Sequence, residues 1–235
     1  MPDRPTGPES IGPVLVVGAG GFVGGHVVRG LAASGRVVLA ASRRRLPDAL
    51  GPPRVHHVAY GELPGLPEAV RETCAASGLA LPGAAVVSIG GWQKGAAVLE
   101  LDPVVWRETL ASHLTAHLDA ARVVVPLLAS AAMPGGAPYV VLNGAASYQA
   151  MAGSGAISVT GAGLSMLVRV LRQEQDELGT ARGVRFHELV IDDAVAEDDR
   201  NESPERTVDP ARVAQAVGEL VDRPGADAVV HLGGS

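Results

Sequence analysis

Cysteine and lysine each occur once in the 235 residues, as Cys74 and Lys94. A lone cysteine excludes a disulfide framework and a cysteine-rich zinc site. Since lysine and arginine together number 19, the other 18 basic residues are arginines, and a motif that needs lysine has one possible location. No apolar run approaches the roughly 18 residues that cross a bilayer. We therefore expect no membrane partner.

Basic side chains are also fewer than acidic ones. With 25 acidic residues against 19 basic ones the formal net charge is −6, whereas a nucleic-acid binder needs a basic footprint. Nucleic-acid partners are therefore not expected. No metal site is expected either, because the adjacent His56 and His57 point to opposite faces of a strand. The acidic stretch between Asp192 and Asp199 is interpreted as a solvated loop.

The first 12 residues are polar and proline-rich, which is unlike a signal peptide and predicts a flexible leader of a cytoplasmic protein. From residue 13 onward, short apolar runs alternate with helical periodicity. Strands are predicted at 14–17, 37–40, 55–58, 84–87, 139–142, 184–191 and 228–232. Helices are predicted at 26–32, 68–76, 102–130 with a bend at Pro126, 157–178 and 210–221.

This alternation predicts βαβ units with right-handed crossovers. The expected fold is α/β, a doubly wound, Rossmann-type parallel sheet of about seven strands with helices on both faces. No linker interrupts the pattern, so residues 13–235 are predicted to form a single domain.

A glycine-rich segment directly follows the first predicted strand. Its pattern is Gly18-x-x-Gly21-x-x-Gly24, overlapping Gly18-x-Gly20. A helix N-terminus presents unpaired N–H groups, and glycines let a pyrophosphate approach the backbone. This placement favours an NAD(P)-binding domain over a turn that only packs a helix on the sheet. The predicted cofactor contacts are Gly18, Gly20, Gly21, Phe22, Val23 and Gly24.

The end of the second predicted strand indicates which dinucleotide is preferred. An acidic residue there would hold the ribose 2′-hydroxyl of NAD, but this chain has Ser42, Arg43 and Arg44. Arginine beside a hydroxyl suits a 2′-phosphate, so we expect NADP(H) to be preferred over NAD(H). The alternative is a solvated basic turn.

With these features the chain resembles the short-chain dehydrogenase/reductase family over roughly residues 13–234. Residues 85–91, Ala-Val-Val-Ser-Ile-Gly-Gly, stand where the family carries Asn-Asn-Ala-Gly, which implies cofactor contacts at Ser88, Ile89 and Gly90. Residues 106–115 resemble the family's fourth helix, and 228–234 its terminal strand and glycine pair. The resemblance also implies a homodimer or homotetramer that pairs the fourth and fifth helices.

The family's catalytic residues do not carry over. The tyrosine aligns with Ile157, the lysine four residues later with Gly161, the serine with Gly144 or Ala145, and the asparagine with His113. No Tyr-x-x-x-Lys occurs elsewhere, because residue 90, four before Lys94, is glycine. Hydride delivery to a carbonyl needs a proton donor within reach, and general acid catalysis contributes about 10²–10⁴-fold.

Five residues near the ends of the fourth and fifth strands are candidates for replacement chemistry. His113 is the best candidate acid, because an imidazole donates a proton near neutral pH. Each of three candidates has a structural alternative. His113 is then a buried histidine bonded to a backbone carbonyl, Tyr148 an amphipathic lid residue and Lys94 an exposed loop residue. The full candidate set is His113, Tyr148, Lys94, Asn143 and Ser147.

Three functions are compatible with these observations. The first is an atypical NADP(H)-dependent oxidoreductase that acts on a small, largely apolar metabolite with non-standard catalytic residues. The second is a non-redox enzyme on the same scaffold, such as a cyclase, dehydratase or isomerase. The third is a catalytically silent cofactor-binding subunit.

Overall fold

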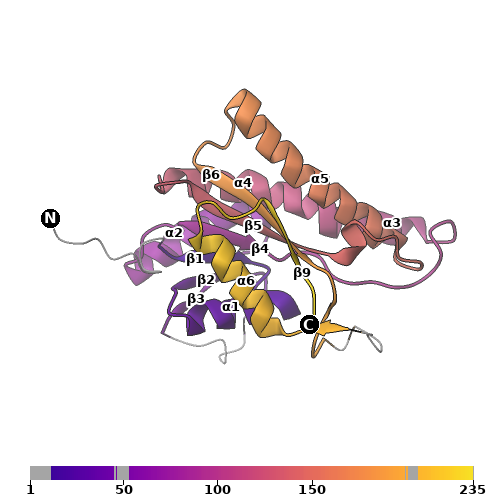
Figure 1. Ribbon diagram of the computed structural model, residues 1–235. Helices are drawn as coiled ribbons and strands as arrows, with labels where there is room; N and C mark the ends of the chain where they lie inside the picture. The colour runs from indigo at the N-terminus through magenta and orange to yellow at the C-terminus, as the bar shows by residue number, and fades with distance from the viewer. Residues whose placement is uncertain (1–11, 45, 47–52, 199, 201–205, 235) are drawn as a thin grey trace.

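The computed structural model describes residues 12–234 except 45, 47–52, 199 and 201–205. The predicted leader, residues 1–12, lies outside the described residues apart from its last one. Seven strands form one parallel sheet in the order β3-β2-β1-β4-β5-β6-β9 (Figure 1). The predicted doubly wound, Rossmann-type α/β fold is confirmed. The strands are β1 (Val14–Val17), β2 (Val38–Ser42), β3 (Val55–Ala59), β4 (Ala84–Val87), β5 (Ala137–Gly144), β6 (Val184–Ile191) and β9 (Val229–Leu232).

The central strands are short and uniformly apolar. All residues of β1 and β4 are buried. Successive side chains of a strand point to opposite faces, so Leu15 and Val17 join one core while Val14 and Val16 join the other. Strands without polar alternation are typical of a sheet that is covered on both faces.

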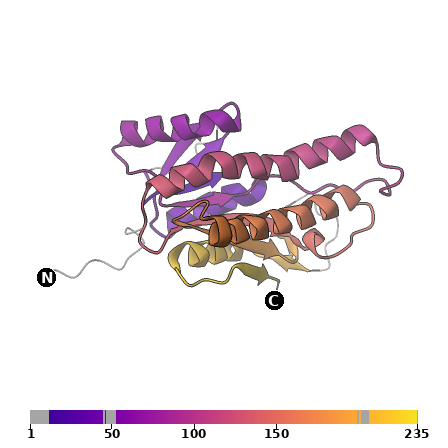
Figure 2. The same cartoon turned by 90° about the horizontal axis from the view of Figure 1, so that it is seen from above.

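Helices cover the two faces unequally (Figures 1 and 2). One face carries α1 (Phe22–Ala33) and α6 (Pro210–Asp222). The other carries α2 (Leu66–Ser77), α4 (Ala116–Ser130) and α5 (Gly155–Leu178). The helix boundaries agree with the predicted ones to within a few residues.

The long helix predicted over 102–130 consists of three consecutive segments. They are α3 (Pro103–Thr109), a π-helical segment η4 (Leu110–Thr115) and α4. The winding therefore changes at 110–115, whereas α4 continues through Pro126, the predicted bend. Such π-bulges occur frequently at functional sites.

Four short elements escaped the sequence pattern. Two are the 3₁₀ turns η3 (Leu63–Gly65) and η5 (Ala145–Ser147), and two are the paired strands β7 (Ala194–Val195) and β8 (Thr207–Val208). They have two or three residues each, which is too few for a period to be visible. Among the helices that the structure describes, none combines the length and apolarity that crossing a bilayer requires.

Gly30 brings α1 into close contact with α6, because a methyl group at position 30 would overlap the Ala214 methyl group. We expect Gly30→Ala to lower the free energy of unfolding by about 1–3 kcal/mol, since overpacking outweighs the gain in helix propensity. Urea denaturation followed by circular dichroism measures the change. The control is Gly65→Ala, where an added methyl meets nothing within 4 Å. Unchanged stability in Gly30→Ala would contradict the close packing.

Candidate active site

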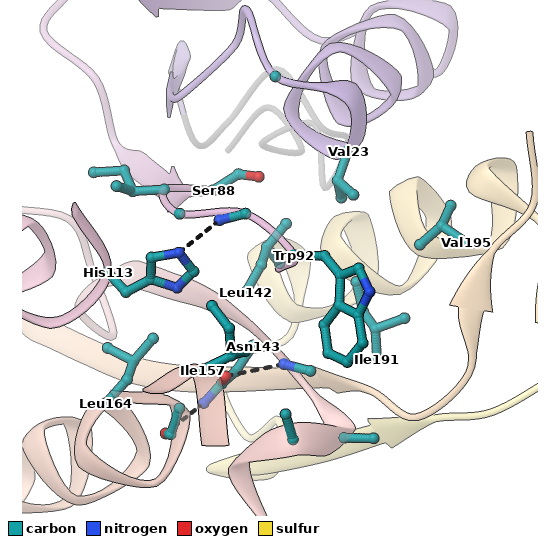
Figure 3. A pocket seen from close by; sticks show the side chains of 18 of the residues that line it. Val23, Ser88, Trp92, His113, Leu142, Asn143, Ile157, Leu164, Ile191 and Val195 are labelled. Atoms are coloured by element: carbon teal, nitrogen blue, oxygen red, sulfur yellow. Dashed lines mark hydrogen bonds between the residues drawn. The ribbon is translucent and has the colours of Figure 1, made fainter. Parts of the chain in front are cut away.

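The order of the strands reverses between β1 and β4. Ligands of open parallel sheets bind beyond the carboxyl ends of the strands at such a point. A cavity of about 360 Å³ lies there. Its wall is formed by the β1–α1 turn, the loop after β4, η4, the end of β5, helix α5 and the loop after β6 (Figure 3).

The β1–α1 turn requires glycine at two positions. Gly18 has a φ of +88°, and a side chain there would overlap the Ser88 carbonyl group. A side chain at Gly24 would overlap the Gly18 carbonyl group in the same way. The backbone of this turn is therefore packed as closely as glycine permits, which leaves its outer side open to a ligand.

The N-terminus of α1, like those of α2 and α5, has no side-chain cap, whereas those of α3 and α6 have one. Asp102 and Asp209 cap α3 and α6 by accepting hydrogen bonds from backbone N–H groups at 2.7 Å. Helix α1 begins after Gly21 with no side-chain cap and no acidic residue in its first turn. The first N–H groups of a helix have no intrahelical partner, so those of Phe22 and Val23, which line the cavity, are available to an anion.

The turn after β2 carries the predicted 2′-phosphate contacts. The Ser42 hydroxyl is buried, donates to the Arg44 carbonyl oxygen and lies 3.0 Å from His57 Nε2. Because both of these partners are protein groups, Ser42 shapes the turn and is not free for a phosphate. Arg43 and Arg44 have exposed side chains. Arg43 is close enough to Tyr60 to oppose the rise in the pKa of that phenol, which burial causes.

Two histidines one helical turn apart hold the loop after β4. His113 Nε2 accepts a hydrogen bond from the Gly91 N–H at 3.1 Å, so its proton belongs on Nδ1 (Figure 3). His117 Nε2 lies 3.1 Å from the Ile89 carbonyl oxygen and must donate to it. His117 Nδ1 is consequently an acceptor, and it is buried with no partner in the described part of the chain.

Both imidazoles are held in the neutral form. Burial lowers the pKa of His113, and burial lowers the pKa of His117 to about 4 even though the Ile89 carbonyl opposes this. Protonating His113 on Nε2 would also break the bond from Gly91. A neutral imidazole is a poor proton donor, so these contacts favour the positioning of loop 89–91 over the predicted acid role of His113.

The positions aligned with the family's tyrosine and lysine are closed to polar chemistry. Ile157 is 8% exposed and contributes an apolar side chain to the cavity wall. At Gly161, the Cβ of any other residue would lie 3.1 Å from the Ser147 Cα atom and 3.2 Å from its N atom. Helix α5 thus approaches η5 too closely for a lysine to be accommodated without movement.

A buried hydrogen-bond network maintains this close approach. Asn143 Nδ2 donates to the Gly161 carbonyl oxygen at 3.0 Å and to Glu188 Oε1 at 2.8 Å. The Ser165 hydroxyl donates to the same Glu188 oxygen at 2.6 Å. Asn143 Oδ1 accepts from the Gly144 N–H at 2.9 Å. Asn143 lines the cavity (Figure 3), but its amide is committed to protein partners.

Tyr148 belongs to a second polar cluster beside the cavity. Its hydroxyl donates to Asp192 Oδ1 at 2.6 Å, and this bond raises the pKa of Tyr148. His231 Nδ1 lies 2.9 Å from the same oxygen, and the Tyr148 and His231 rings meet edge to face. Asp192 lines the cavity, whereas Tyr148 and His231, which are bonded to Asp192, are not among the lining residues.

The structure therefore separates the predicted site residues. Lys94 is exposed and contacts the turn at Gly153, and Ser147 lies against Gly161; neither lines the cavity. Gly18, Gly20 and Gly24 shape the β1–α1 turn without lining the cavity. The predicted residues that do line it are Gly21, Phe22, Val23, Ser88, Ile89, Gly90, His113 and Asn143.

Sequence reasoning missed three residues of this region. Asp192 was expected in a solvated loop, but it borders the cavity, as does Trp92 (Figure 3). His231 approaches Asp192 because β9 pairs with β6 and both strands end at the same edge. The available signal was positional: Asp192 directly follows β6, and residues after parallel strands gather at one edge of the sheet.

No protein-family model matches the sequence, and no curated protein matches it. Solved structures do. The 3-hydroxyacyl-CoA dehydrogenase type-2 from Mycobacterium avium is 23% identical over 97% of this chain and 96% of its own, with a TM-score of 0.75. An NADH-dependent reductase A1-R′ complexed with NAD is 14% identical over 95% of each chain (TM-score 0.73). A metagenomic short-chain oxidoreductase complexed with NADP is 17% identical over 97% of this chain and 99% of its own (TM-score 0.72). The chain has the fold of these proteins.

His117 makes stability depend on pH. Its pKa is about 4 when folded and 6.5 in an unperturbed histidine, so between these values the unfolded chain binds more protons. Stability therefore falls as the pH drops from 6.5 to 4, by roughly 3 kcal/mol from this residue, and His117 adds no pH dependence above 6.5. We expect His117→Gln to lose correspondingly less stability than wild type between pH 7 and pH 4.5 in urea denaturation. His56→Gln is the control, and an unchanged pH dependence in His117→Gln would refute the assignment.

Proposed function

We propose that this chain is an atypical member of the short-chain dehydrogenase/reductase family, a single NAD(P)-binding domain over residues 13–235 that acts as a nicotinamide-dependent oxidoreductase. One observation carries the proposal. The uncapped N-terminus of α1 opens on the same cavity as the ends of β4, β5 and β6. A dinucleotide that has its pyrophosphate at α1 would extend toward those strand ends, where a substrate also has access.

The residues present fit such a cofactor. The N–H groups of Phe22 and Val23 would hold the pyrophosphate, since the tight turn at Gly18 and Gly24 leaves room for it. Ser88 would contact the nicotinamide half from the loop after β4. When bound, the reduced nicotinamide supplies a hydride.

Arg43 and Arg44 support a preference for NADP(H). Both side chains are exposed on the turn after β2, and none of residues 42–44, which directly end and follow the strand, is an acid that would hold a 2′-hydroxyl. The similar solved structures include one complex with NADP and one with NAD. The preference is therefore argued from the arginines and not from those complexes.

The cavity wall indicates what the protein contributes to the reaction. Leu142, Ile157, Leu164 and Ile191 surround the reaction end with apolar side chains (Figure 3), which suits a small apolar substrate and excludes water. His113 and His117 keep loop 89–91 in place. The hydroxyl of Tyr148 is held by Asp192, so any proton from Tyr148 would pass through that carboxylate.

Ile157 also supports a second candidate function. A side chain without a proton at the position of the family's acid is compatible with a non-redox enzyme, such as a cyclase, dehydratase or isomerase, or with a silent cofactor-binding subunit. Product formed without net oxidation of cofactor would favour the non-redox enzyme. Binding of cofactor with no turnover of any kind would favour the silent subunit.

Titration with NADPH and NADH tests the cofactor assignment. We expect calorimetry to detect binding of NADPH and weaker binding of NADH. Arg43→Ala should weaken NADPH binding about tenfold and leave NADH binding unchanged, because only NADPH has the 2′-phosphate. Gly24→Val should abolish binding of both by closing the turn. Arg71→Ala, an exposed arginine on α2, is the control, and failure of wild type to bind either nucleotide would reject the proposed function.

We also propose that the chain forms a homodimer or homotetramer through α4 and α5. Val159, Met166 and Val170 are 51%, 52% and 41% exposed and share one face of α5, because they are seven and four residues apart. Exposed apolar side chains in one stripe are typical of an interface.

Charge placed in this stripe should separate the subunits. We expect Met166→Glu with Val170→Glu to reduce the mass measured by light scattering after size exclusion to that of a smaller species, because two buried carboxylates would face the partner. Ala75→Glu with Ala76→Glu on the exposed side of α2 is the control. A monomeric wild type, or an unchanged mass in the α5 variant, would contradict the proposed interface.

A further inference from the structure

Carboxylates outnumber arginines and lysines among the described residues that line the cavity. Three of the described lining residues are carboxylates, namely Asp192, Asp193 and Asp198, against one guanidinium, that of Arg200. Arg200 bonds both oxygens of Asp198, at 2.8 and 2.6 Å. Asp193 has the Arg206 guanidinium 3.6 Å from its Oδ2 and accepts a hydrogen bond from the Gly234 N–H at 2.6 Å. Asp192 is therefore the lining carboxylate that faces no arginine or lysine among the described residues.

The carboxylate of Asp192 is oriented by its neighbours. Tyr148, which follows β5 in the chain, donates to Oδ1 at 2.6 Å, and Nδ1 of His231, in β9, lies 2.9 Å from the same oxygen. The other carboxylate oxygen, Asp192 Oδ2, has no hydrogen-bond partner among the described residues. One oxygen is therefore anchored while the other is available to a donor on a ligand.

His117 is a polar residue of the cavity wall that is 2% exposed. Its Nδ1 is buried and has no hydrogen-bond partner among the described residues. Because this nitrogen is not accessible from the cavity, the ligand class is inferred from Asp192 and Trp92.

Trp92 adds an aromatic face. Figure 3 shows its indole ring across the cavity from His113, beside Ile191. An aromatic face attracts organic cations, and tryptophan does so more strongly than other side chains. An indole and a carboxylate on the wall of one cavity form a site that suits a positively charged nitrogen with hydrocarbon substituents.

Carbonyl reduction fits this site poorly. The oxygen of a reduced carbonyl develops negative charge and needs donors. The Gly91 N–H and the Asn143 amide are already bonded to protein acceptors, so that the Ser88 hydroxyl and the Trp92 N–H would have to serve. Ile157 supplies no proton. Nearby carboxylates would oppose the developing charge.

We propose that the substrate is an iminium ion, a carbon–nitrogen double bond with positive charge, which the enzyme reduces to an amine beside Asp192 and Trp92. The inference rests on the proposed oxidoreductase function and names its substrate class. The iminium carbon accepts a hydride from the reduced nicotinamide, so that a C–H bond forms and the C=N π electrons become a lone pair on nitrogen. The positive charge passes to the oxidised nicotinamide. No proton enters the step, which explains why a tyrosine–lysine pair is dispensable.

A permanently charged probe tests the reaction. N-methyl-3,4-dihydroisoquinolinium and the neutral ketone 1-tetralone have similar shape, and NADPH consumption reports the reduction of either one. We expect the iminium to be reduced and the ketone to be reduced at least about tenfold more slowly. Reduction of the ketone without reduction of the iminium would overturn the inference and leave the proposed function standing.

Binding provides a readout that does not depend on turnover. Calorimetry on the full chain, with and without NADP⁺, compares N-methyltetrahydroisoquinoline, which is protonated at pH 7, with the neutral isochroman. We expect the amine to bind more tightly, and Asp192→Asn to weaken amine binding by about 10- to 100-fold, the range of a charged hydrogen bond. The affinity for isochroman should not change.

Two further variants guard against a misfolded mutant. Trp92→Leu should weaken binding of the amine more than binding of isochroman, and Asp227→Asn, an exposed aspartate away from the cavity, should change neither. Equal affinity of wild type for amine and isochroman overturns the inference. If neither NADPH nor NADH binds, the proposed function fails and the hydride step fails with it.

Discussion

The hydrogen bonds around Glu188 hold α5 against β5 and β6, and the shape of the cavity depends on them. The carboxylate is 2% exposed and receives donors from Asn143 and Ser165. Asn143 also binds the Gly161 carbonyl oxygen, so the helix is held where a side chain at 161 would meet the backbone of η5. A buried carboxylate without such partners would be strongly destabilising. The bonds from Asn143 and Ser165 therefore make the burial of Glu188 possible.

This packing has a chemical consequence for the reaction end of the cavity. A side chain at 161 would require η5 to shift by a few tenths of an ångström, and Ile157 one turn earlier presents hydrocarbon to the cavity. Among the polar groups that line the cavity, the Asp192 carboxylate is an acceptor with one anchored oxygen. The proposed substrate class therefore rests on the part of the wall that carries Asp192 and Trp92.

Part of the β1–α1 turn and of the turn after β2 was predictable from local sequence. Gly24 is required by a close contact with the Gly18 carbonyl group six residues earlier, whereas the need for glycine at 18 comes from Ser88 at the end of the neighbouring strand β4. The arginines at 43 and 44 are local features of the sequence after β2. The roles of Ser42 and His113 were not predictable, because their hydroxyl and imidazole are bonded to groups that the fold brings near. The residue type alone does not show whether a polar side chain is hydrogen-bonded within the protein or is free to bind a ligand.

The sequence by itself determined the alternation of strands and helices, the uncapped glycine turn and the absence of a tyrosine–lysine pair, since each depends on residues that are close in the chain. Only the tertiary structure decided which polar groups reach the cavity. Tyr148, Asp192 and His231 meet because β5, β6 and β9 are adjacent and end at one edge of the sheet. Contacts between segments so far apart in the sequence depend on the order of the strands in the sheet. The local periodicity of the sequence carries no information about that order.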